Sequence, residues 1–273
     1  MKKNPLTSYV LSAYNEEEHI EECINSLLNQ DYENLEILVT DDGSEDKTLE
    51  ILKNISNKNK KLKVFTQQHL GMAQGWNNSF SHSKGEIIIM FGADMVASKE
   101  FTTKLIHPII HEDCVGSSPK IEMTKNIENI WARAKIRKRT YKKNFLAISR
   151  KAWIKVGGAD TRRGYDADAT FADSISEKPR RVDVEISHYL PATFSEFWKQ
   201  SVWIGRSMNL KNRTKLFLSL PLMPFIIIYK SVKKIIEDPF LPLIFFMPIY
   251  NSLKYLAFYI GATQFILFGE RKR

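Results

Sequence analysis

LEILVTDDGSEDKT, residues 35–48, is the stretch that decides the fold. It opens with an apolar run of strand length, Leu35–Val39, which leads to two carboxylates, Asp41 and Asp42, and then to a Gly-Ser turn and a helix-like pattern. Open α/β sheets bind ligands where a strand ends and the next helix begins. The order of residues therefore predicts a nucleotide-sized site, although Asp, Gly and Ser are also common in simple turns and helix caps.

Strand-like and helix-like patterns alternate four times in the first part of the chain. This alternation predicts an α/β fold with a doubly wound, mostly parallel, Rossmann-like sheet. Asn15 is expected to cap the first helix, with Glu18 completing a capping box. The expected strands are Ser8–Ala13, Leu35–Val39, Leu62–Thr66 and Glu86–Phe91. The first three are each followed by an expected helix, which begins after Glu16, spans Glu45–Ile55 and opens at Gly71. The fourth strand is followed by the acid Asp94.

Acidic side chains follow three of these strands. Glu16 follows the first, Asp41 and Asp42 end the second, and Asp94 follows the fourth. Because parallel strands end at the same edge of a sheet, these acids should converge. A divalent cation that bridges carboxylates and a diphosphate would account for such a gathering, since hard cations prefer oxygen ligands.

Composition narrows the class of protein. The 273 residues are 43% hydrophobic and 26% charged, which is typical of a globular chain, and the net charge is +9. The charge by itself suits nucleic acid, an anionic membrane surface or a phosphorylated substrate. Zinc-finger spacing is absent from the sequence, so nucleic acid is not an expected partner. The two cysteines, Cys23 and Cys114, have no metal or redox spacing, and the N-terminal apolar stretch is too short for a signal peptide.

Taken together, these stretches resemble the family 2 nucleotide-sugar glycosyltransferases, enzymes with the GT-A fold. The resemblance covers roughly residues 6 to 208 and depends on an ordered set of motifs rather than on any one of them. The matching stretches are Val10–Glu16, Val39–Thr48, Gly71–Asn77, Asp94, Asn144–Arg150, Val156–Asp160 and Gly164–Asp168.

The resemblance implies roles for the matching residues. Asp94 would bind a divalent metal, Mn²⁺ or Mg²⁺, on the donor diphosphate. Asp166 would be the general base that deprotonates the acceptor hydroxyl, so that the reaction inverts the anomeric configuration. His188 would bind the metal or act as a charged donor to the leaving group. The expected nucleotide-sugar-binding residues are Tyr14, Asn15, Glu16, Asp41, Asp42, Asn77 and Asp94.

Three residues depart from the family pattern. Gly92 stands where the first acid of Asp-x-Asp is expected, Trp76 where the family usually has Arg, and Tyr165 where a Glu precedes the catalytic Asp. Asp94 and Asp166 keep the positions that matter more for the chemistry. Asp168 is expected to be a helix N-cap.

Two further stretches could meet an acceptor. Gln200, Trp203 and Arg206 keep helical spacing in a weakened form of the family's Gln-x-x-Arg-Trp element, which favours a single sugar addition, although a helix at a membrane surface fits equally. A basic helix with an aromatic residue is expected to face an acceptor phosphate or lipid heads, a plain solvated helix being the alternative. Its residues are Trp131, Arg133, Lys135, Arg137, Lys138 and Arg139.

The C-terminal part is strongly apolar and predicts a membrane-associated segment, residues 211–273, after a catalytic domain of residues 1–210. Leu216–Tyr229 would reach only about 21 Å as a helix and fits an interfacial or re-entrant element. Phe240–Phe268 is long enough to span, yet polar residues and prolines are expected to divide it: Pro242, Pro248, Asn251, Ser252 and Lys254. In-plane or re-entrant helices would keep three basic clusters on the cytoplasmic face: Lys211, Arg213 and Lys215; Lys230, Lys233 and Lys234; and Arg271, Lys272 and Arg273.

The leading hypothesis is an inverting glycosyltransferase that moves one sugar from a UDP- or GDP-sugar to a membrane-borne acceptor, such as a lipid-linked glycan in cell-surface polysaccharide synthesis. Polyprenyl phosphate is an alternative acceptor. A catalytically degenerate module that binds nucleotide or glycan is the alternative from another class, suggested by Gly92 and Tyr165.

Overall fold

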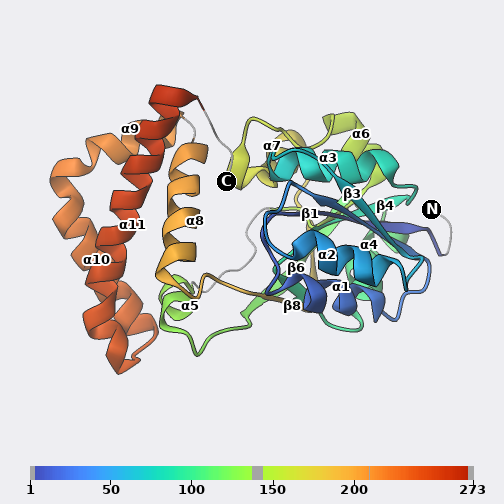
Figure 1. Cartoon of the computed structure of the whole chain (residues 1–273), viewed down its shortest axis with the longest axis horizontal. Helices are drawn as coiled ribbons and strands as arrows, with labels where there is room; N and C mark the ends of the chain where they lie inside the picture. The colour runs from blue at the N-terminus through green and yellow to red at the C-terminus, as the bar shows by residue number, and fades with distance from the viewer. Residues whose placement is uncertain (1–3, 137–143, 209, 270–273) are drawn as a thin grey trace. The chain divides into compact units, whose positions relative to one another are not determined.

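The computed structural model describes residues 4–136, 144–208 and 210–269 (Figure 1). By contacts the chain forms two compact units. The first unit comprises residues 1–123, 138–161 and 166–189, and the second comprises residues 124–137, 162–165 and 190–273. The domain boundary expected at residue 210 stays a prediction, but α8, Phe194–Ser207, groups with the C-terminal helices.

The first unit is built on an eight-stranded sheet in the order β3-β2-β1-β4-β7-β6-β8-β5. β1 pairs in parallel with β2 and β4, and β2 pairs in parallel with β3, whereas β7 is antiparallel to β4. The mostly parallel sheet is therefore confirmed. The strands are β1 Thr7–Ala13, β2 Leu35–Asp41, β3 Leu62–Thr66, β4 Ile87–Gly92, β5 Met95–Ala97, β6 Gly116–Thr124, β7 Ala147–Ser149 and β8 Arg180–His188.

Both faces of this sheet are covered by helices, as Figure 1 shows with α3, α6 and α7 on one side and α1, α2 and α4 on the other. Along β1, Tyr9 and Leu11 pack into one core cluster while Val10 packs into the other. Burial on both faces is the reason that the parallel strands are continuously apolar. The helices of the first unit are α1 Ile20–Leu28, α2 Thr48–Ser56, α3 Met72–His82, α4 Phe101–His111, α6 Arg150–Val156 and α7 Ala169–Ser174.

The start of α1 differs from the expectation. The capping box predicted at Asn15 and Glu18 is wrong, because α1 begins at Ile20 with His19 at its N-cap. Asn15 has a positive φ of 53°, and its side-chain oxygen accepts a hydrogen bond from the backbone of Glu45 instead. A tertiary contact between two loops thus overrides a local capping signal.

The second unit is helical. Its helices are α5 Ile130–Lys135, α8 Phe194–Ser207, α9 Leu210–Leu218, α10 Met223–Glu237 and α11 Leu241–Phe268, with a short 3₁₀ turn, Leu220–Leu222, before α10. Two glycines bring α8 and α11 together. A Cβ added at Gly261 would lie 2.0 Å from the carbonyl oxygen of Val202, and one added at Gly205 would lie 2.4 Å from that of Phe258.

The expectation that Phe240–Phe268 is divided is wrong. α11 is one helix of 28 residues with Pro248 inside it. Its polar residues find partners within the second unit: Asn251 donates to the hydroxyl of Ser231, and the Lys254 ammonium lies 5.8 Å from the centre of the Tyr250 ring. Because these polar groups are accommodated, they do not interrupt the helix.

α11 is also the one described helix whose length and apolar composition would let it cross a membrane, and a third of its most apolar stretch is buried. The segments Asn212–Leu218 and Leu220–Glu237 would count as a second crossing only if taken together, and they are bent by 58°. The bend agrees with the re-entrant or interfacial character expected of Leu216–Tyr229.

The basic helix expected to face an acceptor or lipid is wrong for the residues that the structure describes. α5 ends at Lys135, and its side chains contact other residues of the second unit. Arg133 forms a bidentate ion pair with Asp238, with N–O distances of 2.9 and 2.8 Å. Trp131 packs on Phe197 and Phe246. Arg137, Lys138 and Arg139 lie outside the described residues.

The close approach at Gly261 predicts that a Gly-to-Ala substitution there lowers stability, the opposite of its usual effect in a helix. In an open helix, replacing Gly by Ala stabilises by about 1 kcal/mol. Here Gly261→Ala should instead lower the free energy of unfolding by about 1–3 kcal/mol, because the new methyl group meets backbone that cannot move aside. Urea unfolding followed by circular dichroism measures the change.

Thr263→Ala, at an exposed position of the same helix, is the matched control and should change stability little. A stabilised Gly261→Ala variant would contradict the packing of α11 on α8.

Candidate functional site

Hydrogen bonds join the loops after β1 and β2 at the carboxyl edge of the sheet. The Asn15 backbone N–H donates to the Ser44 hydroxyl at 3.0 Å, and the Asn15 side-chain oxygen accepts from the Glu45 backbone at 2.9 Å. The Glu16 backbone N–H donates to the Thr48 hydroxyl at 2.8 Å. These bonds hold the loop of Asn15 and Glu16 against the loop that follows Asp41 and Asp42. The expected approach of Asp94 to these acids stays a prediction.

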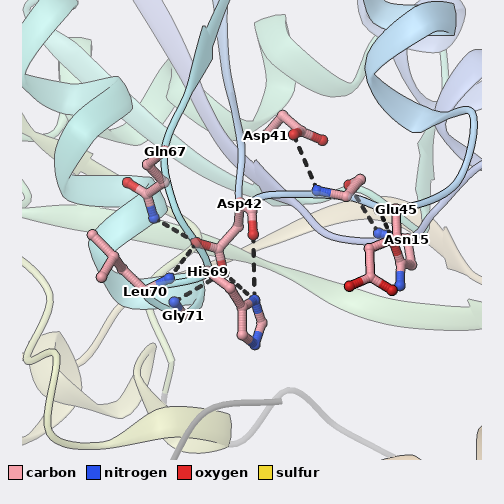
Figure 2. A network of polar contacts seen from close by, with 9 residues as sticks. Asn15, Asp41, Asp42, Glu45, Gln67, His69, Leu70 and Gly71 are labelled. Carbon is pink, nitrogen blue, oxygen red and sulfur yellow. Dashed lines mark hydrogen bonds and ion pairs between the residues drawn. The ribbon is translucent and has the colours of Figure 1, made fainter.

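Asp42 organises a second loop, Gln67–Gly71, as Figure 2 shows. One carboxylate oxygen accepts from the Gln67 side chain and from the Leu70 backbone, both at 2.7 Å. The other accepts from the Gly71 backbone at 2.9 Å and pairs with His69 Nδ1 at 3.2 Å. The carboxyl is 2% exposed. Asp42 therefore has a structural role that sequence reasoning missed, and its predicted contact with a base stays a prediction.

Asp41 is almost fully buried and only half satisfied. Its Oδ2 accepts from the Ser44 backbone at 3.2 Å, while its Oδ1 has no hydrogen-bond partner among the residues that the structure describes. A buried carboxylate oxygen without a donor is costly, and such groups usually mark a place that water or a ligand fills. Asp41 thus keeps one buried acceptor unsatisfied, and its predicted contact with a nucleotide stays a prediction.

An aromatic pair stands next to these acids. The rings of Tyr14 and His69 lie 4.1 Å apart, with 34° between their planes. His69 Nδ1 is also 3.3 Å from the Asp42 carbonyl oxygen. Sequence reasoning found Tyr14 but not His69, because a single His in a polar loop carries no recognisable pattern. The pair forms a surface on which a planar ring can stack.

Asp94 is part of a chain of three charged side chains. His188 Nε2 lies 2.8 Å from Asp94 Oδ2, and His188 Nδ1 lies 3.0 Å from Glu122 Oε1. Antiparallel pairing of β5 with β8 sets Met95 opposite His188 and so brings Asp94 alongside. Glu122, on β6, was missed because its stretch matches no family motif.

The charges around His188 set its protonation. Burial lowers the pKa of His188, but the carboxylates of Asp94 and Glu122 more than offset this and raise the pKa to about 9. The ring is then an imidazolium near neutral pH, and each of its N–H groups donates to one carboxylate. It places a fixed positive charge beside Asp94.

The residues present bear on the expected metal. Within the described residues there is no cluster of three or more His, Cys, Asp or Glu side chains arranged to hold a cation. Both ring nitrogens of His188 face carboxylates, so the ring in this arrangement offers no lone pair to a metal. Mg²⁺ and similar cations are often held by one or two carboxylates plus substrate phosphates. Asp94 fits that manner of binding.

Other residues that the sequence singled out make contacts within the protein. Asn77 donates to the carbonyl of Ala159 at 2.8 Å and accepts from its N–H at 2.9 Å, so it ties α3 to the loop after α6. Asp168 stands at the N-cap position of α7, as expected, but its side chain does not cap the helix and accepts from the Asn144 amide. Asp166 ends a 3₁₀ turn, Gly164–Asp166, and is partly exposed.

Three α8 residues were expected at an acceptor or diphosphate, and each packs within the second unit. Gln200 accepts a hydrogen bond from Lys135, and Arg206 donates to Gln264 at 2.9 Å. Trp203 is 8% exposed and meets the Tyr165 ring edge to face, with centroids 5.1 Å apart. Their role toward a substrate stays a prediction.

Comparison with known proteins points to one family. The model described as Glycosyl transferase family 2 matches residues 8–170. An uncharacterized glycosyltransferase of Haemophilus influenzae is 37% identical over 107 residues, which are 39% of this chain and 33% of that protein. A dolichyl N-acetyl-alpha-D-glucosaminyl phosphate 3-beta-D-2,3-diacetamido-2,3-dideoxy-beta-D-glucuronosyltransferase of Methanococcus voltae is 33% identical over 98 residues, 34% of this chain and 30% of that protein. The matches thus span about a third of these relatives.

Solved structures share the fold. The mannosyltransferase PcManGT from Pyrobaculum calidifontis, in complex with GDP-Man and Mn²⁺, superposes with a TM-score of 0.59 at 18% identity, covering 98% of this chain and 77% of that one. S. aureus TarS 1-349 in complex with UDP gives a TM-score of 0.56 at 17% identity, covering 97% of this chain and 92% of that one. At these identities the likeness is one of fold, of the GT-A type.

The hydrogen bonds of Asp42 predict a large effect of a small change. Asp42→Asn keeps the shape but removes the charge and turns an amide N–H₂ toward donors. We expect the free energy of unfolding to fall by about 2–3 kcal/mol, since hydrogen bonds to buried charged groups are the strong ones. Urea unfolding checks this.

Glu33→Gln makes the same chemical change at an exposed position and should alter stability by less than about 0.5 kcal/mol. If both variants unfold like the wild type, Asp42 does not hold the Gln67–Gly71 loop.

Proposed function

Because the chain belongs to glycosyl transferase family 2, we propose that it is an inverting glycosyltransferase that transfers a single sugar from a nucleotide-diphosphate-sugar to a membrane-borne acceptor. The observation that carries the proposal is that Asp41 ends β2, Asp42 follows it, and Asp94 follows β4, so that the three acids come after the carboxyl ends of parallel strands within the segment that matches the family. This edge is where open α/β sheets bind nucleotides.

The donor nucleotide has partners of the right chemistry in the first unit. The adjacent rings of Tyr14 and His69, tilted by 34° to each other, suit a nucleobase. The buried Asp41 Oδ1, which lacks a partner among the described side chains and backbone groups, suits a ribose hydroxyl or a base N–H. UDP- and GDP-sugars are the proposed donors, since the fold neighbours were solved with UDP and with GDP-Man.

Asp94 and His188 form the proposed diphosphate end of the donor site. A Mn²⁺ or Mg²⁺ ion held by Asp94 and the donor phosphates would neutralise charge on the leaving nucleoside diphosphate. The His188 imidazolium supplies a second positive charge whose position is set by Asp94 and Glu122. This charge supports departure of the diphosphate even where Gly92 replaces an acid of the family pattern.

Asp166 is the proposed general base. Its carboxylate takes the proton from the acceptor hydroxyl while that oxygen attacks the anomeric carbon from the face opposite the diphosphate. The bond to the diphosphate breaks as the new glycosidic bond forms, so an α-linked donor gives a β-glycoside. The partly exposed turn Gly164–Asp166 leaves the carboxyl within reach of an incoming substrate.

The acceptor is the least defined partner. We propose a lipid-linked glycan at the cytoplasmic face of the cell membrane, in cell-surface polysaccharide or glycoconjugate synthesis, with the apolar C-terminal helices as the attachment. The polyprenyl-phosphate alternative loses support, since Arg133 and Lys135, two of the cations expected to meet that phosphate, are engaged within the second unit. Gly92 favours the remaining alternative, a degenerate module that binds nucleotide without transfer.

Nucleotide-dependent thermal stabilisation tests the donor site. UDP, GDP, dTDP and CDP, each with and without Mn²⁺ or Mg²⁺, are added to the detergent-purified full chain. One of them should raise the melting temperature in the presence of metal, because a ligand that binds only the folded state stabilises it. Asp94→Asn should abolish the metal-dependent part of this shift and leave the metal-free part.

If no nucleotide stabilises a protein that circular dichroism shows to be folded, the donor site is not formed as proposed. A shift that persists unchanged in Asp94→Asn would remove Asp94 as the metal ligand.

Substitution of the base separates transfer from binding. Asp166→Asn should lower the rate of nucleoside diphosphate release with a membrane lipid extract as acceptor by about 100-fold or more, which is the usual contribution of a general base. The thermal shift with nucleotide should not change, because Asp166 acts on the acceptor.

Asp173→Asn, an exposed position in α7, is the matched control and should keep the full rate. An Asp166→Asn variant with full activity would indicate a phosphate acceptor that needs no base, and a wild type that binds nucleotide without any transfer would favour the degenerate module.

A further inference from the structure

α10 carries an apolar face that the described part of the chain leaves open to solvent. The exposed residues lie three or four positions apart and so share one side of the helix. We call them the α10 stripe: Phe225 at 70% exposure, Ile228 at 61%, Tyr229 at 65%, Val232 at 49% and Ile236 at 75%. Contiguous apolar faces of this kind mark contact with another protein or with lipid.

α11 adds a second exposed face. Leu241, Phe245, Ile249 and Leu256 recur at helical spacing and are each more than half exposed, whereas Met247, Tyr250 and Tyr255 between them are buried. α8, α10 and α11 lie side by side (Figure 1), and their buried faces form the core of the second unit.

Two exposed lysines follow residues of the α10 stripe. Lys233 follows Val232, its side chain is 59% exposed, and its ammonium lies 4.0 Å from the Glu237 carboxylate. Lys230 follows Tyr229, is exposed, and its ammonium donates to the Tyr255 hydroxyl. Long basic side chains beside an apolar face extend their charges to anionic headgroups while the face enters the acyl boundary. Lys234, in contrast, is buried and donates to the Ile136 carbonyl at 3.0 Å, so it takes no part.

The packing of these helices argues against a crossing. α10 has 15 residues and reaches about 22 Å, short of a hydrocarbon core of about 30 Å. α11 is long enough, but Gly205 and Gly261 seat its backbone directly on α8. α8 carries Glu196, Lys199 and Arg206, charged groups that would have to enter the bilayer with it.

We propose that the α10 stripe, with the exposed apolar residues of α11, lies in the plane of an anionic lipid surface, and that none of the described helices crosses the bilayer. This inference rests on the proposed function, for which it defines how the enzyme meets a membrane-borne acceptor. Lys230 and Lys233 make the contact sensitive to ionic strength, because salt screens attraction to anionic headgroups.

Vesicle flotation of the full chain tests the proposal. Vesicles of phosphatidylcholine alone and of phosphatidylcholine with phosphatidylglycerol are compared at low and high salt. The wild type should float with the anionic vesicles and less so at high salt. Ile228→Ser combined with Val232→Ser should lower the bound fraction about tenfold, because binding scales with buried apolar area. Ile154→Ser, a 62%-exposed site in the first unit, is the matched control and should bind as the wild type.

Alkaline carbonate extraction of cell membranes separates lying on the bilayer from crossing it. The in-plane arrangement predicts release of the wild type into the supernatant, and retention in the pellet would overturn it. Equal flotation of the stripe variant would also overturn it, as would a wild-type dimer in light scattering that the stripe variant converts to a monomer, since a second copy would then cover the face.

The nucleotide-dependent thermal shift is recorded on the same variants. Loss of flotation with an intact shift concerns the membrane surface alone, whereas absence of the shift in the wild type concerns the proposed function.

Discussion

The rest of the first unit depends on the parallel pairing of β1 with both β2 and β4. Ser12 lies opposite Thr40 on one side and opposite Gly92 on the other, so the three strands end within a residue or two of one another. Parallel strands end at the same edge, so Asp41, Asp42 and Asp94 all follow strands that end there. Close packing supports this pairing: a Cβ at Gly75 would lie 2.2 Å from the Ser12 hydroxyl, so α3 sits directly on β1.

At this edge the acids divide into structural and available groups. Both carboxylate oxygens of Asp42 accept hydrogen bonds from the Gln67–Gly71 loop, and this loop places the His69 ring against the Tyr14 ring. Its charge therefore shapes this loop through the backbone. Asp41 keeps one buried oxygen for which the described residues supply no donor. Of two adjacent acids, one thus organises a loop and the other keeps a buried acceptor without a partner.

The C-terminal segment shows the same division between internal and external use of side chains. Polar and basic residues that would suggest a helix break or a phosphate contact in an isolated stretch are matched within the second unit: Arg133 with Asp238, Asn251 with Ser231, and Arg206 with Gln264. Many of the apolar residues, in contrast, are exposed. Because buried polar groups need partners while apolar groups need only a non-aqueous neighbour, such a unit is suited to a lipid surface.

Local sequence determined where the strands lie, which acidic residues follow them, and which family the chain resembles. Apolar runs bounded by turns predict β1 to β4 well, and Leu62–Thr66 matches in full, because hydrophobic periodicity is a short-range property. Tertiary structure alone decided which side chains meet. Glu122, His188 and Asp94 come from three separate segments joined by antiparallel strands, and His69 reaches Tyr14 through a loop held by Asp42. Capping and charge patterns failed at Asn15 and Arg133 because long-range hydrogen bonds were stronger than the local alternatives.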